Sequence, residues 1–260
     1  MTDWQAIIMG AIQGLTEFLP VSSSGHLVLI DKLLGISGNS LMLDVFLHTG
    51  TLLAVLVYYW RQIVSIAKHP LGTLGRRLLV STIPTVIIAV LFEKTFEQIF
   101  HSGATLGIEF VITGTLLLYI ESRPAIPGIR KERIRLSSAL WIGVAQGAAI
   151  LPALSRSALT IGTSLASGMR RDDAVQYSFL LSVPIVFGAT VFEIKDLGSA
   201  SGMLGGTLWL ALAASAIMGY LAIWSMTRLI KKISLRPFGY YTLALGLLVI
   251  LDQTFFHHFF

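Results

Sequence analysis

Six apolar runs of about the length needed to cross a lipid bilayer limit what this chain can fold into. A helix needs roughly 20 mainly apolar residues to cross about 30 Å of hydrocarbon. Only 13% of the residues are charged, against about 25% in soluble domains. Because backbone groups find no water in hydrocarbon, runs of this length favour helices. We therefore predict an all-α polytopic membrane protein with spans near 44–60, 78–92, 105–120, 174–192, 207–227 and 238–251.

Two further apolar regions are each broken midway by polar residues. Region 4–34 is interrupted by "PVSSSGH", and region 136–168 is interrupted by "PALSRSA". Each half is about 15 residues long, which is short for a full crossing. Non-helical backbone is tolerated at membrane depth where protein or a cavity surrounds it. We predict that each region forms a re-entrant helix–loop–helix hairpin, which enters and leaves the membrane on one side.

The order hairpin, three spans, hairpin, three spans suggests an internal repeat. We divide the single membrane domain into repeat one (1–121), a basic linker (122–135) and repeat two (136–260). Because three is an odd number of spans, the second repeat should be inverted relative to the first. Inverted repeats with broken helices usually form their site where the two halves meet. An ungapped alignment of the hairpins supports the repeat weakly, pairing Gln13-Gly14 with Gln146-Gly147 and 22–24 with 155–157, whereas Pro20 and Pro152 differ by one position.

The basic residues predict which end of the protein faces the cytoplasm. Fifteen of the 19 Lys and Arg residues lie in the loops 61–77, 121–137, 168–173 and 228–237. Cytoplasmic loops of membrane proteins are enriched in these residues. We therefore expect these loops inside the cell and both termini outside, in a multi-pass protein of the cell membrane. The net charge of +5 then requires no nucleic-acid partner. The segment "RRDD" at 170–173 is interpreted as a solvated helix start.

Three ionisable residues in the broken regions are candidates for function: Glu17, His26 and Arg156. Burying such a group in a membrane costs about 2.5–3.5 kcal/mol, so those that are retained usually have a role. A structural role is the alternative for each: an interfacial carboxylate, a hydrogen-bonded imidazole, or a basic anchor between two loops. Serine and glycine alone would be weak evidence, because they commonly pack membrane helices.

These residue types together favour phosphate chemistry. Helices that begin after "SSSG" and "SRS" present backbone N–H groups and a positive dipole end to an anion. Arg156 offers a planar donor fork that suits phosphate. Glu17 offers hard oxygen ligands for a divalent cation, Mg²⁺ or Ca²⁺, bridged to a diphosphate. His26 or a serine of the loop could accept the phosphoryl group or position water. The absence of cysteine excludes thiol catalysis.

The segments "QGLTEFLPVSSSGH" and "PALSRSALT" resemble the two signature motifs of the undecaprenyl-diphosphate phosphatase (bacitracin-resistance) family. "DVFLHTGTLLAVLVYYW" and "YSFLLSVPIVFGA" are also similar to family segments, so the resemblance extends over most of the chain. Two positions depart from the family pattern. Gln13 stands at the first acidic position, as a permitted variant, and Ala153 replaces the glycine of the second motif.

This resemblance implies an integral-membrane phosphatase that converts a polyprenyl diphosphate to the monophosphate and inorganic phosphate, which recycles the lipid carrier for cell-wall synthesis. Combined with the pattern above, it predicts Glu17, Ser23, His26 and Arg156 as catalytic, with Glu17 also the metal ligand. Either Ser23 or His26 would be the nucleophile, with the other as its partner, or water would attack directly. The predicted substrate-binding residues are Gln13, Ser22, Ser24, Gly25, Gln146, Ser155, Ser157 and Thr160. The expected partners are the lipid substrate and membrane lipids, and a homodimer is a candidate assembly.

A transporter of the lipid-carrier phosphate is the main alternative function. Inverted repeats with paired hairpins are a transporter architecture, and a fold alone does not decide function. A carrier needs to bind phosphate but has little use for a hydroxyl, an imidazole and a carboxylate together. The residues therefore favour an enzyme, and the two activities are compatible.

Overall fold

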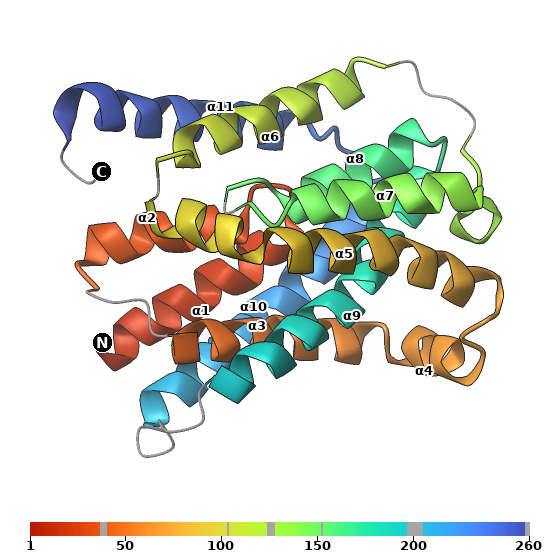
Figure 1. Cartoon of the computed structure of the whole chain (residues 1–260), viewed down its shortest axis with the longest axis horizontal. Coiled ribbons are helices and arrows are strands. Elements are labelled where there is room, and N and C mark those ends of the chain that lie inside the picture. Colours follow the sequence, from red (N-terminus) through yellow and green to blue (C-terminus); the bar gives the residue numbers. More distant parts are fainter. Residues whose placement is uncertain (37–40, 103, 124–127, 152, 197–204, 258–260) are drawn as a thin grey trace.

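The computed structural model describes the chain except for residues 37–40, 103, 124–127, 152, 197–204 and 258–260. The regular secondary structure of its described part is helical, apart from one isolated bridge between Ile129 and Met169. Eleven α-helices follow one another (Figure 1): α1 (Asp3–Phe18), α2 (Ser23–Leu34), α3 (Leu41–Tyr58), α4 (Trp60–Lys68), α5 (Thr73–Ser102), α6 (Leu106–Glu121), α7 (Leu136–Ala148), α8 (Arg156–Ala166), α9 (Arg171–Asp196), α10 (Gly206–Leu229) and α11 (Arg236–Leu251). A 3-10 turn (Lys131–Arg133) precedes α7, and a π-helical turn (Asp252–Phe256) follows α11.

The predicted all-α membrane class is confirmed. All six predicted spans are helices, and five of them are long and apolar enough to cross a membrane: α3, α5, α9, α10 and α11. The sixth, α6, has 16 residues, which corresponds to about 24 Å at 1.5 Å per residue. A full crossing by α6 therefore stays a prediction.

Each broken region is a pair of helices joined by a short polar tip. Helix α1 ends because Pro20 follows Leu19, and the residue before proline prefers the extended backbone that Leu19 adopts (φ −81°, ψ 146°). Ser22 then caps α2 by accepting a hydrogen bond from the Gly25 N–H, and Ser155 caps α8 in the same way. Pro152, which was aligned with Pro20, lies outside the described residues.

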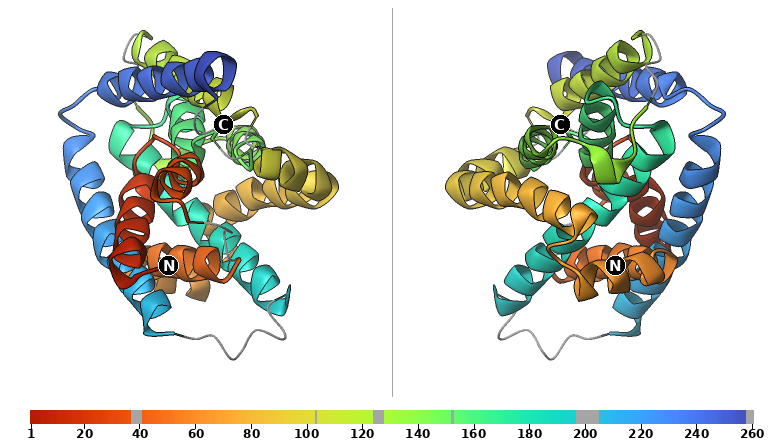
Figure 2. Two further views of the ribbon diagram at one scale, coloured as in Figure 1. Left: turned by 90° about the vertical axis from the view of Figure 1, so that its left-hand side faces the viewer. Right: turned by 90° about the vertical axis from the view of Figure 1, so that its right-hand side faces the viewer.

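Each of the two hairpins packs against a helix that belongs to the other predicted repeat. Helix α1 lies along α10, α7 lies along α5, and α6 lies along α11 (Figure 1 and Figure 2). Small residues allow these close approaches: a Cβ atom on Gly14 would overlap the Ser215 carbonyl oxygen of α10, and one on Gly143 would overlap the Ser81 carbonyl oxygen of α5. Such contacts are typical of helices that associate in lipid. The packing brings the two tips together near the middle of the molecule.

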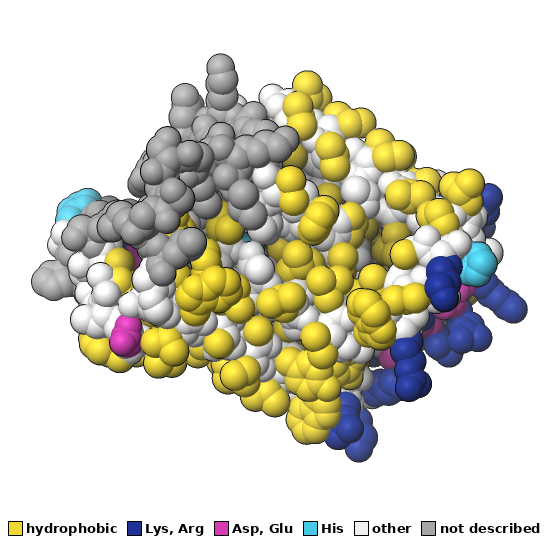
Figure 3. Space-filling view, turned by 90° about the horizontal axis from the view of Figure 1, so that it is seen from below, with side chains coloured by type: hydrophobic (Ala, Val, Ile, Leu, Met, Phe, Trp, Pro, Cys, Tyr) yellow, Lys and Arg dark blue, Asp and Glu magenta, His cyan; other side chains and the backbone are white. Residues whose placement is uncertain are grey.

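The two ends of the molecule differ in charge. Both termini lie at one end, and α4 lies at the other (Figure 1). On the face in Figure 3, Lys and Arg side chains gather at the end away from the termini, and apolar side chains cover much of the remainder. Many large apolar residues on the long helices are exposed, as expected for contact with lipid, among them Val90, Leu91 and Leu248. The inverted relation of the repeats and their boundaries stay predictions.

The interpretation of "RRDD" as a solvated helix start holds for Arg170 and Asp172, whose side chains are 43% and 35% exposed, but it is wrong for Asp173. Asp173 is 3% exposed, and its carboxylate lies 2.9 Å from Lys131 Nζ and 2.7 Å from Arg170 Nη2. Arg171 forms a 2.6 Å ion pair with Glu121 at the end of α6. The physical reason is that the linker folds back onto the first turn of α9, where its backbone pairs with residues 168–170. The buried Lys131 ammonium of the linker then meets the Asp173 carboxylate of that turn.

Candidate active site

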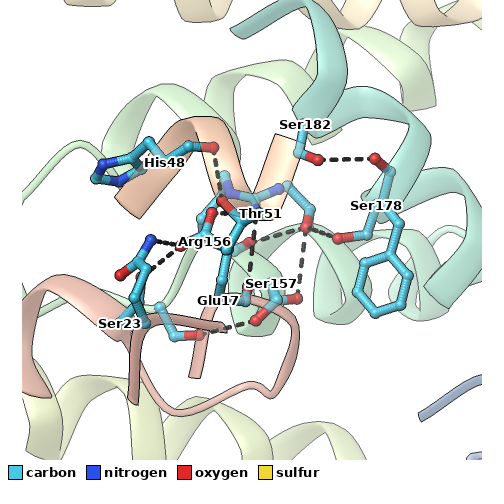
Figure 4. A network of polar contacts seen from close by, with 12 residues as sticks. Glu17, Ser23, His48, Thr51, Arg156, Ser157, Ser178 and Ser182 are labelled. Carbon is cyan, nitrogen blue, oxygen red and sulfur yellow. Dashed lines mark hydrogen bonds and ion pairs between the residues drawn. The ribbon is translucent and has the colours of Figure 1, made fainter. Parts of the chain in front are cut away.

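The tips of the two hairpins meet through an ion pair. Glu17, in the last turn of α1, accepts a hydrogen bond at Oε1 from Arg156 Nη2, the first residue of α8, at 2.8 Å (Figure 4). The two side chains are only 7% and 14% exposed. Ser157 Oγ also donates to the Leu19 carbonyl oxygen of the first tip at 2.8 Å. The carboxylate and the guanidinium, which the sequence places 139 residues apart, thus form one buried polar centre.

The second oxygen of the Glu17 carboxylate has two donors from its own hairpin. Glu17 Oε2 accepts from Gln13 Nε2 at 3.1 Å, because residues four apart on a helix lie on the same face. It also accepts from Ser23 Oγ, in the first turn of α2, at 2.5 Å (Figure 4). The Ser23 hydroxyl therefore directs its proton at a carboxylate, which is the geometry that an activated oxygen nucleophile requires.

The remaining predicted serines and threonine organise the tips. Ser22 and Ser155 are helix caps, and Ser155 Oγ lies 3.2 Å from Ser157 Oγ. Thr160 Oγ1 lies 2.6 Å from Ser178 Oγ of α9 and donates to the Arg156 carbonyl oxygen. The remaining two residues of the first tip, Ser24 and Gly25, lie in the first turn of α2. The positive ends of α2 and α8 face this centre, which favours an anion there.

Gln146 has a different environment from Gln13, with which the repeat alignment paired it. Its Nε2 donates to Thr85 Oγ1 of α5 at 3.2 Å. The reason can be read from the sequence: the residue four positions after Gln13 is Glu17, whereas the residue four positions after Gln146 is Ile150. An apolar side chain offers the amide no partner, so the amide turns to α5.

His26 is turned away from the carboxylate and toward α11. Its Nδ1 lies 2.5 Å from the Ser22 carbonyl oxygen, and its Nε2 lies 2.7 Å from the Tyr241 hydroxyl. The expected pairing of His26 with Ser23 is thus replaced in this structure by a Ser23–Glu17 pair and a His26–Tyr241 pair. No sequence motif pointed to Tyr241, which is remote in the chain and half-exposed.

Helix α6 holds the second tip through two residues that the sequence analysis did not select. Glu109, 4% exposed, accepts the Ala153 N–H at 2.5 Å and the Thr105 hydroxyl at 2.7 Å. Thr113 Oγ1 accepts the Ser155 N–H at 3.1 Å. Glu109 had a usable signal, because it is an ionisable residue inside a predicted span. Thr113 had none, because threonine is common in membrane helices.

Three buried polar atoms of the candidate residues have no hydrogen-bond partner among the described residues: Gln13 Oε1, Arg156 Nη1 and Gln146 Oε1. Buried polar atoms are nearly always paired, so unpaired ones indicate a ligand, an ion or water. Arg156 Nη1 can donate to an anion, and Gln13 Oε1, beside the Glu17 carboxylate, can coordinate a cation. The described residues contain no cluster of three or more His, Asp or Glu side chains suited to a metal. One carboxylate and one amide oxygen fit a Mg²⁺-type ion that completes its shell with substrate phosphates and water.

The sequence is similar to proteins of one family over almost its full length. The model of the family described as bacitracin resistance protein BacA matches residues 6–248. A protein of Carboxydothermus hydrogenoformans named undecaprenyl-diphosphatase is 41% identical, and the match covers 97% of this chain and 98% of the relative. A protein of Halothermothrix orenii with the same name is 42% identical, with coverages of 96% and 98%. Undecaprenyl-diphosphatase 3 of Bacillus cereus is 40% identical, again with coverages of 96% and 98%.

Proposed function

The chain belongs to the bacitracin resistance protein BacA family, and from this premise we propose that it hydrolyses undecaprenyl diphosphate to undecaprenyl phosphate and inorganic phosphate. This reaction would recycle the lipid carrier for cell-wall synthesis. The observation that carries the proposal is the hydrogen bond from Ser23 to Glu17. The same carboxylate also pairs with Arg156 of the other tip. A protein that only binds phosphate has no need for a hydroxyl paired with a carboxylate, so this pair supports hydrolysis over simple transport.

The proposed first step is attack by Ser23 Oγ on the terminal phosphorus. The hydroxyl proton moves to Glu17 Oε2, the P–O bond to the bridging oxygen breaks, and undecaprenyl phosphate leaves. Glu17 passes this proton to the departing phosphate and is a carboxylate again. Water then attacks the phosphoserine as Glu17 takes a proton from it, and the bond between phosphorus and Ser23 Oγ breaks. Glu17 returns the proton to Ser23 Oγ, which restores the hydroxyl as inorganic phosphate is released. The 2.5 Å contact of Ser23 with Glu17 favours Ser23 over His26 as the nucleophile, because both ring nitrogens of His26 already have other partners.

Arg156 would bind the phosphates while it holds Glu17. Its Nη2 pairs with the carboxylate, and its Nη1 is buried without a partner among the described residues. A guanidinium can serve both groups because its donors form a planar fork. The N-terminal turns of α2 and α8 would add backbone N–H groups to the same anion.

A divalent cation, Mg²⁺ or Ca²⁺, would be held by the Glu17 carboxylate and Gln13 Oε1. When bound, it would offset the charge of the two adjacent phosphates in the transition state. The support is the unpaired Gln13 oxygen beside the carboxylate. Substrate phosphates and water would complete the coordination of such an ion.

We also propose that the basic end of the molecule lies in the cytoplasm and that both termini lie outside. The distribution of Lys and Arg supports this orientation. Reporters fused to either terminus should be found outside the cell membrane, and thiol labels introduced at 61–77 should react only from the cytoplasm. A cytoplasmic C-terminus would contradict both the orientation and the inverted repeat. Membrane lipids and a second copy of the chain stay predicted partners.

Phosphate release by purified protein tests the function. Detergent-solubilised protein should release phosphate from undecaprenyl diphosphate without any membrane gradient. EDTA should abolish the release, and Mg²⁺ or Ca²⁺ should restore it. Ser23→Ala should lower kcat at least about a hundredfold with little change in KM, as expected for a group that acts in the transition state. Ser122→Ala is the control, because Ser122 follows the end of α6 and its hydroxyl donates to the Tyr119 carbonyl oxygen of that helix. Tight binding of the lipid by folded, metal-supplied protein without hydrolysis would support the transporter instead.

A further inference from the structure

Tyr241 holds the side chain of His26 although it lies in neither signature motif. Its hydroxyl is 2.7 Å from His26 Nε2, and the two rings are stacked, with centroids 5.7 Å apart and planes at 17°. Phe110 of α6 packs its ring at 90° to the imidazole, with centroids 5.5 Å apart. The imidazole is therefore fixed in position and in plane by aromatic rings from α6 and α11.

These contacts also fix which nitrogen of the neutral imidazole carries the proton. A carbonyl oxygen can only accept, so the Nδ1 that lies 2.5 Å from the Ser22 carbonyl oxygen is the protonated nitrogen. Nε2 is then the acceptor, and the Tyr241 hydroxyl donates to it. Partners of this kind are the usual means by which a protein selects one histidine tautomer.

The Ser22 carbonyl that receives this hydrogen bond belongs to a strained turn. Ser22 has φ of 72° and ψ of 103°, in a region that residues other than glycine rarely adopt. Such a conformation persists only where neighbouring contacts hold it. The Ser22 carbonyl oxygen accepts from both the backbone N–H and the Nδ1–H of His26. The next residue along the chain is Ser23, whose hydroxyl points at Glu17.

We propose that Tyr241 is a positioning residue that acts through His26. Its hydroxyl and ring hold the imidazole in the tautomer that clamps the Ser22 carbonyl, and this clamp keeps the turn in the conformation that directs Ser23 at Glu17. In this role His26 orients the nucleophile rather than taking its proton. The proposal rests on the proposed phosphatase function for its kinetic consequence, but its structural part does not depend on activity.

The kinetic test compares two adjacent tyrosines of α11. Tyr241→Phe keeps the ring but loses one hydrogen bond, which is worth about 1 kcal/mol, so kcat should fall about fivefold with KM nearly unchanged. Tyr240 is 61% exposed, and Tyr240→Phe should leave kcat within about twofold. Equal losses in the two variants would overturn the proposal.

A second variant separates positioning from general support of the fold. Glycine adopts positive φ without strain, and it is a tolerated helix cap. In a Ser22→Gly background the turn therefore needs the clamp less. Tyr241→Phe should then lower kcat by a clearly smaller factor than it does in the native background. The same loss of kcat in both backgrounds would refute the proposal that Tyr241 acts through the turn.

Nitrogen NMR of the imidazole tests the structural part independently of turnover. The wild-type His26 signal, assigned by its loss in His26→Gln, should report a single Nδ1–H tautomer, and Tyr241→Phe should convert it to a mixture. Tyr240→Phe should leave the signal unchanged. A wild-type mixture, or a Tyr241→Phe spectrum identical to that of the wild type, would overturn the proposal even in a protein with full activity. If the wild-type protein shows the expected tautomer but releases no phosphate, only the proposed function is rejected, and the positioning role of Tyr241 stands.

Discussion

The neighbouring residues Asp172 and Asp173 give a sharp test of the ion pairs at the basic end. Asp173→Asn removes the charge that neutralises the buried Lys131. Breaking a buried pair costs about 3–5 kcal/mol. Lys131 retains Glu132 at 3.2 Å and the other partner, Arg170, is 43% exposed, so we take the lower value of about 3 kcal/mol. At about 2–4 °C per kcal/mol for a chain of this size, Tm should fall by about 6–12 °C.

The control is Asp172→Asn. The Asp172 side chain is 35% exposed and its partners are exposed too, so its pairs should contribute about 0–1 kcal/mol. Heating the detergent-solubilised variants and measuring the fraction that remains monodisperse gives both Tm values. In the double variant Asp173→Asn/Lys131→Met, the loss should be smaller than the sum of the single losses, because the two residues act on one contact. Equal Tm values for the two Asn variants, or additive losses in the double variant, would refute a buried pair.

Three further predictions concern the site and pH. Glu17→Gln should lower kcat at least about a hundredfold. Arg156→Lys should also lower kcat, because an ammonium lacks the planar donor fork of a guanidinium. Near-normal phosphate release by either variant would place the site elsewhere. Glu109→Leu leaves the buried Ala153 N–H of the second tip unpaired, which costs about 1–3 kcal/mol. Activity and Tm should therefore fall more than in Glu109→Gln. The reverse order would exclude the contact between Glu109 and the tip. Burial alone would raise the pKa of the Glu121 carboxyl, but hydrogen bonds from Arg171, Leu235 N–H and Ser234 outweigh it and lower the pKa below its usual 4.5. This stabilisation is present above pH 4.5 and is lost as pH falls through the lowered value, so the acid loss of Tm should be smaller in Glu121→Gln.

Much of the fold could be predicted because membrane spans impose long apolar runs. The predicted span at 207–227 is helix Gly206–Leu229, and that at 105–120 is Leu106–Glu121. Helix Trp60–Lys68 was missed because its nine residues are too few and too polar to span. Helix α5 continues to Ser102, beyond the predicted end at 92. The end of an apolar run indicates where a helix leaves the lipid, and the helix itself can continue into water.

The residues of the candidate site could be predicted only where a charged side chain lies in an apolar region of the sequence, because burying such a charge in a membrane costs free energy. Glu17 and Arg156 stood out as charges in broken apolar regions, and the structure pairs them. The partners of His26 and Ser155 could not be found in this way. Tyr241 and Thr113 are ordinary residues of membrane helices, and their importance comes from packing between segments distant in the chain.

Helix α6 links the two tips, which gives a reason for its close packing on α11. Glu109 and Thr113 hold the second tip, while Phe110 contacts the His26 ring of the first. A rotation or slide of α6 would therefore move the tip that carries Arg156 and the histidine behind Ser23 together. Close packing fixes α6 to its neighbour. A Cβ on Gly107 or Gly114 of α6 would overlap atoms of α11, and a Cβ on Gly246 of α11 would overlap the Gly107 carbonyl oxygen of α6. The pair α6–α11 can thus set the register of a site whose reactive groups it does not carry.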